Sequence, residues 1–289
     1  MSERKPSAET PLREIPFRIE NRRGDAVYGD VRFHPSEAPR PVVVVCHGFK
    51  GFKDWGMFPA WGRALARAGF VSVTFNFSYN GVAPEHPTDF TRLDRFAENT
   101  LTRELDDLDA VLAAVVEDRL PEAPVDPARL GLMGHSRGGG IALLQAADDA
   151  RVRALATWNA VSCFLERFTP EQIALWERQG YVEVVNARTG QVMRLNRTLY
   201  DDALAHRERL DVRAAAARMA APWLLVHARD DRAVPFAEAE ALLAAAPHAL
   251  LLEASGGHTF GSRHPFTGPL PEPLREVFEH TRSFFQEHL

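Results

Sequence analysis

The hexapeptide Gly134-His135-Ser136-Arg137-Gly138-Gly139 follows an apolar run at residues 129–133 and precedes an alanine-rich helical stretch. This order predicts a strand, a sharp turn that carries a serine, and a helix. In a G-x-S-x-G turn the glycines flank the serine because the tight backbone leaves no room for larger neighbours. The Ser136 hydroxyl would then stand at a helix N-terminus, where a nucleophile can meet an acyl carbonyl.

The composition of the 289 residues is that of an ordinary globular protein, with 45% hydrophobic and 25% charged residues. One α/β domain with an inserted segment fits this length better than two independent domains. The net charge of −5 gives no basic field for phosphate backbones, so we expect no nucleic-acid partner. Residues 1–10 are polar and no apolar run is long enough to cross a bilayer, so we expect a cytoplasmic protein without membrane contact.

Alternating and apolar runs outside the serine turn predict a mostly parallel sheet flanked by helices. Residues 15–20 and 26–33 alternate around a glycine-containing turn and predict an N-terminal antiparallel hairpin. Residues 42–46 are apolar on both faces, as in a central strand. The other predicted core elements are helix 55–68, strand 70–75, helix 93–120, strand 129–133, helix 138–147, strand 152–158, strand 223–228, helix 236–246, strand 249–253 and helix 273–288.

The strand and helix rhythm breaks between Ser162 and Met219. This segment predicts a helix at 170–179, a hairpin at 181–195 and a helix at 211–220. We interpret residues 162–219 as a lid inserted over the carboxyl edge of the sheet, before the strand that precedes the acid. The hydrolase core would then consist of residues 1–161 and 220–289.

A serine hydroxyl needs a general base, and the base needs a group that orients it. Two adjacent carboxylates, Asp230 and Asp231, come just after the strand at 223–228, and His258 follows the next strand. Both positions fall at strand carboxyl ends, on the same edge as the serine turn. Strand position alone leaves Asp230 and Asp231 as candidates for the acid, and His264 as a distant rival of His258 for the base.

Four short motifs lie along the chain in one order: His47-Gly48, the turn from Gly134 to Gly138, D-x-x-V-P at Asp231 to Pro235, and Gly256-Gly257-His258. With these motifs the chain resembles serine hydrolases of the α/β-hydrolase fold. Among these hydrolases, the chain is similar to small cytoplasmic acyl esterases of the feruloyl or cinnamoyl esterase type and to their dienelactone-hydrolase-like relatives.

The resemblance implies a triad in which Ser136 attacks, His258 takes and returns the proton, and Asp231 holds the imidazole. It also implies an oxyanion hole made by the backbone N–H groups of Phe49 and Arg137. The expected activity is carboxylic ester hydrolysis on a small-molecule ester through an acyl-enzyme, without a cofactor or a metal. Cleavage of amides or thioesters by the same triad remains an alternative, as does a non-catalytic binding protein.

Substrate contacts are the least specific part of the sequence. Lys50, Phe52 and Trp158 are our candidates for contacting the substrate. Lys50 and Arg137 could meet an anionic substrate tail or only water. The aromatic residues Phe49, Phe52, Trp55 and Phe58 could line an acyl pocket, although helical spacing makes core packing equally good for Trp55 and Phe58. The oligomeric state, including a homodimer, is left open.

Overall fold

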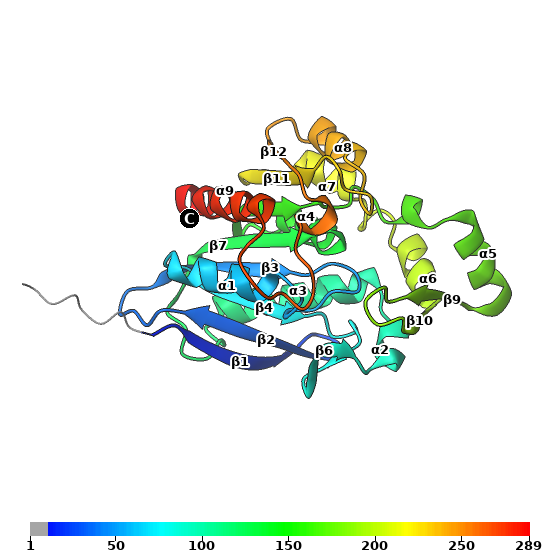
Figure 1. Cartoon of the computed structure of the whole chain (residues 1–289), viewed down its shortest axis with the longest axis horizontal. Coiled ribbons are helices and arrows are strands. Elements are labelled where there is room, and N and C mark those ends of the chain that lie inside the picture. Colours follow the sequence, from blue (N-terminus) through cyan, green and yellow to red (C-terminus); the bar gives the residue numbers. More distant parts are fainter. Residues whose placement is uncertain (1–10) are drawn as a thin grey trace, which may run out of the picture.

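An eight-stranded sheet forms the centre of the computed structural model, which describes residues 11–289 (Figure 1). Its strand order is β1-β2-β4-β3-β7-β8-β11-β12. The strands are β1 (Arg13–Glu20), β2 (Ala26–Phe33), β3 (Arg40–Cys46), β4 (Val71–Asn76), β7 (Val125–His135), β8 (Val152–Trp158), β11 (Trp223–Ala228) and β12 (Leu250–Ala254).

Most neighbouring strands of this sheet are parallel. From β4 through β3, β7, β8 and β11 to β12 every pairing is parallel, whereas β1 pairs with β2 and β2 with β4 in the antiparallel sense. The predicted α/β-hydrolase fold, with an N-terminal hairpin on a mostly parallel sheet, is therefore confirmed. Because parallel strands share a direction, the loops after β7, β11 and β12 leave the sheet at one edge.

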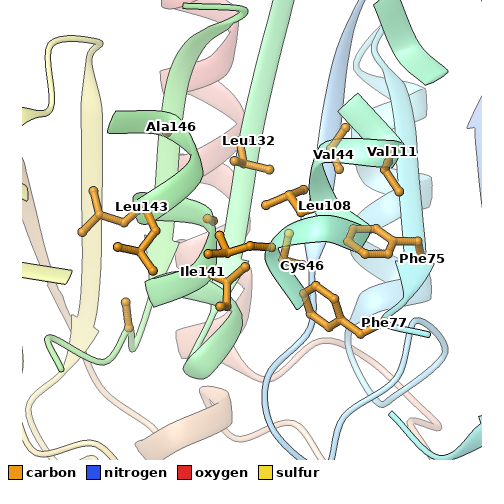
Figure 2. Close-up of a cluster of buried hydrophobic side chains, with 14 of the residues drawn as sticks. Val44, Cys46, Phe75, Phe77, Leu108, Val111, Leu132, Ile141, Leu143 and Ala146 are labelled. Carbon is orange, nitrogen blue, oxygen red and sulfur yellow. The ribbon is translucent and has the colours of Figure 1, made fainter. Parts of the chain in front are cut away.

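Helices cover both faces of the sheet, which explains why β3 is apolar throughout. Val42, Val44 and Cys46 point into one core, and Val43 and Val45 into the other. Figure 2 shows part of the first core, where Leu132 of β7 lies among side chains from the facing helices. The helices on this face are α3 (Leu101–Val116), α4 (Arg137–Asp148), α7 (Val212–Arg218) and α8 (Ala237–Ala245), and those on the other are α1 (Phe58–Arg67) and α9 (Glu272–His288).

The structure corrects the predicted helix at 93–120, which is two helices, α2 (Leu93–Ala97) and α3. Thr100 lies between them in an extended conformation, and its side chain accepts a hydrogen bond from Arg103 N. A threonine that caps a new helix in this way ends the preceding one. A short hairpin, β5 (Val82–Ala83) and β6 (His86–Phe90), was not predicted.

The segment between β8 and β11 contains the predicted helix and hairpin. In order it forms η1 (Leu165–Arg167), α5 (Pro170–Gln179), β9 (Tyr181–Val185), β10 (Val192–Asn196), an unpredicted α6 (Thr198–Ala205) and α7. Figure 1 shows α5, α6 and the β9–β10 hairpin at one end of the sheet, and β10 packs against α2. The last helix, α7, packs on α4.

No helix in the described part of the chain is long and apolar enough to cross a membrane. The polar residues 1–10, on which the expectation of a cytoplasmic protein partly depends, lie outside the described residues.

We predict that Leu132→Ala lowers the free energy of unfolding by about 2–5 kcal/mol, because it leaves a cavity where the side chain has no exposed surface. The matched control is Leu250→Ala in β12, where the side chain is 61% exposed and the cost should stay within about 0.5 kcal/mol. Urea denaturation measures both values. Equal losses in the two variants would contradict this account of the core.

Candidate active site

The turn at Ser136 has the sharp geometry that its glycines predicted. Ser136 itself has φ 57° and ψ −123°, a conformation that few side chains adopt. A Cβ on Gly134 would lie 2.2 Å from the Gly138 carbonyl oxygen, and a Cβ on Gly138 would lie 2.3 Å from the His47 carbonyl oxygen. Any residue larger than glycine at either position would therefore force the backbone apart.

The Ser136 hydroxyl does not stabilise the turn or the helix that follows it. Ser136 N donates to Trp158 O across 2.9 Å, which fixes the turn to the end of β8. Its Oγ makes no capping hydrogen bond to α4, although the residue stands at the N-cap position. Ser136 lines a cavity of about 650 Å³ together with His258.

Asp231, the third residue after β11, is paired with His258. Its Oδ2 lies 2.7 Å from His258 Nδ1, and its Oδ1 accepts hydrogen bonds from Ala233 N at 2.7 Å and Val234 N at 3.0 Å. Burial acts to raise the pKa of Asp231, but the hydrogen bonds from His258 and the two backbone N–H groups outweigh it and hold the pKa below its ordinary value. A carboxylate here is therefore charged at neutral pH.

Asp230 has a different partner. Its Oδ1 accepts a hydrogen bond from Gly257 N across 3.0 Å, so it braces the loop that carries His258. The structure thus separates the two adjacent carboxylates that the sequence left as alternatives.

The backbone of His258 is held by two side chains from neighbouring strand ends. The His258 carbonyl oxygen accepts from Asn159 Nδ2 at 2.9 Å and from His135 Nε2 at 2.8 Å. Asn159 has no exposed surface, and its Oδ1 accepts from Ala228 N at 2.7 Å. Asn159 therefore ties the strand before Asp231 to the loop of His258. The sequence does not reveal this role, because a single asparagine after a strand carries no distinguishing pattern.

Two further histidines next to the site are structural. Burial lowers the pKa of His47 to about 4 and that of His135 to about 3, so both rings are neutral at pH 7. His47 Nδ1 donates to Gly48 O across 2.9 Å and its Nε2 accepts from Phe77 N, as expected of a residue that braces the loop after β3.

His264, the other histidine considered as a base, also lines the cavity. Its Nδ1 accepts from Gly56 N at 3.0 Å, and its ring stacks on Trp55 with 6.1 Å between centroids. Its pKa is lowered chiefly by burial. Within the described residues it has no carboxylate partner comparable to that of His258.

Phe49 and Arg137, whose N–H groups are the expected oxyanion donors, are in contact through their side chains. The Arg137 guanidinium lies 4.1 Å from the Phe49 ring centroid and 3.3 Å from the buried Glu104 carboxylate. Arg137 is the first residue of α4, so its N–H has no intrahelical partner. Among residues 11–289 no protein acceptor for Phe49 N–H is found. Both N–H groups are free to bind a ligand oxygen.

The structure corrects two of the three expected substrate contacts. Lys50 lines the cavity, but Phe52 and Trp158 have no exposed surface. Phe52 packs edge-on against Phe90, and Trp158 donates from Nε1 to Thr281 Oγ1 within the core that α9 covers. Buried aromatic rings of this kind support the sheet and do not touch a ligand. The aromatic lining of the cavity comes from Phe49, Trp55 and Phe58 instead.

Among the described residues, no group of three or more His, Cys, Asp or Glu side chains could hold a metal ion.

We predict that Asn159→Ala slows covalent labelling of Ser136 by a fluorophosphonate by about tenfold to a hundredfold, since a 1 Å shift of a catalytic group can cost as much. Thr281→Val is the matched control, because it also removes a buried hydrogen-bond partner, that of the Trp158 ring, but removes no hydrogen bond to the His258 loop. Labelling is followed by mass spectrometry at a temperature where both variants are folded. Equal labelling rates in the two variants would contradict a positioning role for Asn159.

Comparison with known proteins agrees with this architecture. A family model described as alpha/beta hydrolase fold matches residues 41–186. An uncharacterised 31.7 kDa protein from the traX-finO intergenic region of Escherichia coli is 28% identical over 117 residues, which is 40% of this chain. The aligned part spans only 36% of that relative's length.

Two solved structures superpose over nearly the whole chain. The esterase domain of a Rhodothermus marinus protein has a TM-score of 0.62 at 20% identity and covers 96% of this chain and 99% of its own. Est1E from Butyrivibrio proteoclasticus with ferulic acid bound has a TM-score of 0.69 at 20% identity. The superposition covers 94% of this chain and 98% of the Est1E chain. At this identity the likeness concerns the fold alone. With a family model that matches half of its length, the chain belongs to the alpha/beta hydrolase family.

Proposed function

We propose that this protein is a serine hydrolase that cleaves carboxylic esters through an acyl-enzyme. The observation that carries the proposal is the 2.7 Å contact between His258 Nδ1 and Asp231 Oδ2, beside a cavity that Ser136 and His258 both line. A carboxylate, an imidazole and an unengaged serine hydroxyl at one sheet edge are the parts that nucleophilic acyl transfer needs.

In the first half of the reaction Ser136 Oγ attacks the ester carbonyl carbon. Because His258 Nδ1–H donates its hydrogen bond to Asp231 and keeps its proton, the unprotonated Nε2 of His258 takes the serine proton. The resulting imidazolium is stabilised by the Asp231 carboxylate. His258 then gives the proton to the leaving alkoxide, and the alcohol departs from a covalent acyl-Ser136 intermediate.

In the second half water repeats these steps. His258 Nε2 takes a proton from water, the hydroxide attacks the acyl carbonyl, and the returned proton frees Ser136 Oγ as the carboxylic acid leaves. No external acid or base is required, since the same imidazole carries the proton in both halves.

The negative charge that develops on the carbonyl oxygen is assigned to the N–H groups of Phe49 and Arg137. Donors of this kind contribute about 2.7–4 kcal/mol each to lowering an acyl-transfer barrier. The contact between the Arg137 guanidinium and the Phe49 ring supports the assignment, because it shows that the two residues lie side by side.

The segment 162–219 is proposed as a lid on the core formed by residues 1–161 and 220–289. Its β9–β10 turn, at Asn186, Ala187 and Arg188, contributes to the wall of the cavity. Lys50 Nζ donates to Val185 O across 3.2 Å and so connects this hairpin to the oxyanion loop. A segment in this place can shape the site and limit water access.

We predict that Ser136→Ala lowers kcat/KM for 4-nitrophenyl butyrate by at least about 10³-fold, because no nucleophile remains to form the acyl-enzyme. The measurement is release of 4-nitrophenolate by protein purified in parallel with the unaltered chain. Retention of full activity by the alanine variant would refute the mechanism.

The two adjacent carboxylates give a matched pair of variants. Asp231→Asn should lower kcat by about 10⁴-fold, since an amide cannot hold the required imidazole tautomer. In Asp230→Asn the amide oxygen still accepts from Gly257 N, so kcat should remain within about threefold of the unaltered protein. The kcat values of the two variants are measured with 4-nitrophenyl butyrate. A larger loss in Asp230→Asn than in Asp231→Asn would identify Asp230 as the acid.

A further inference from the structure

The cavity beside Ser136 is lined by cations. Lys50, Arg188 and Arg263 all contribute to its wall, and none of its lining residues in the described part of the chain is acidic. The protein as a whole carries a net charge of −5, so the charge of the cavity wall is opposite in sign to that of the whole molecule. A cleft lined by charges of one sign concentrates ligands of the opposite sign.

Two of the three cations have no counter-ion. Neither Lys50 nor Arg263 has a carboxylate within ion-pair distance among residues 11–289. Surface arginines elsewhere are of both kinds: Arg229 forms two hydrogen bonds of 2.6 Å to Glu253, whereas Arg153 and Arg282 form no ion pair within residues 11–289. The third cation, Arg188, donates to Thr88 O at 2.8 Å and lies 3.3 Å from Asp89.

Lys50 is held in place at a cost. Its backbone has φ 56°, in the left-handed region that favours glycine, and its ammonium donates to the carbonyl oxygen of Val185 and lies 5.8 Å from the centroid of the Phe49 ring. Burial lowers the pKa of Lys50, which means that its charge is not fully compensated by the protein. An anionic ligand would supply the missing compensation.

The three cations come from separate loops that converge on the cavity. Lys50 follows β3, Arg188 lies in the β9–β10 turn, and Arg263 lies five residues after His258. The wall of the same cavity also contains the aromatic side chains of Phe49, Trp55 and Phe58. An apolar or aromatic segment of the substrate fits this part, and a charged group fits the cationic part.

We infer that the substrate is an ester that carries an oxyanion, a carboxylate or a phosphate, separated from the scissile carbonyl by an apolar segment and bound by Lys50 and Arg263. The inference rests on the proposed function, because it names the substrate class of the same site.

The test compares two esters that differ only in the terminal group, mono-4-nitrophenyl adipate and 4-nitrophenyl hexanoate. We expect kcat/KM to be at least about tenfold higher for the adipate, because a hydrogen bond to a charged group contributes a free energy that corresponds to about this factor. Lys50→Met and Arg263→Met should each reduce this ratio by about threefold to tenfold, and 0.5 M NaCl should reduce it as well.

The control variant is Arg282→Met, which removes one exposed arginine on α9 that does not line the cavity and should leave the ratio unchanged. Inhibition of hexanoate hydrolysis by adipate and by hexyl phosphate identifies the anion, since the better inhibitor carries the preferred group. Hexanol, which has no charge, should inhibit less than either.

Equal kcat/KM for the two esters, unchanged in Lys50→Met and Arg263→Met, would overturn the inference and leave the proposed function intact. If neither ester is hydrolysed and a fluorophosphonate does not label Ser136, the proposed function fails and the inference fails with it.

Discussion

The absence of space around Ser136 is the constraint on which the site depends. A Cβ on Gly48 would lie 2.9 Å from Ser136 Cβ, and one on Gly138 would meet the His47 carbonyl oxygen. The serine turn and the loop after β3 are therefore in direct backbone contact, at the junction of two parallel neighbouring strands. This contact brings Ser136, the residue before α4, next to the loop that carries Phe49, and the positive φ of Ser136 is its conformational cost.

Hydrogen bonds between strand ends complete the arrangement. Ser136 N is bonded to the end of β8, Asn159 follows β8 and bonds both the Asp231 strand and the His258 loop, and Asp231 bonds His258. All of these links join neighbouring strands of one parallel sheet except the bond from Asn159 to the His258 loop, which reaches from β8 past β11 to the end of β12. The fold itself therefore determines which loops meet. The side chains of Asn159 and Asp231 are buried, where hydrogen bonds are strong and their loss is costly.

The sequence predicted what depends on local pattern. The hairpin, the parallel core and the serine turn follow from alternation, apolar runs and glycines, and these were confirmed. Phe52 and Trp158 could not be placed, because hydrophobicity does not distinguish a core aromatic from one that lines a cavity. Asn159 and the unpaired Arg263 were missed for a related reason: their importance comes from neighbours distant in sequence. The break at Thr100 was visible only as a capping residue inside a longer helical pattern.

The most direct test of the account is detection of the acyl-enzyme. The purified protein is mixed with 4-nitrophenyl butyrate, quenched in acid within the first turnovers and digested for mass spectrometry. We predict a butyryl group on Ser136, in amounts that match the initial burst of 4-nitrophenolate. Hydrolysis of the ester with no acyl group on Ser136, or with the group on another residue, would contradict the account.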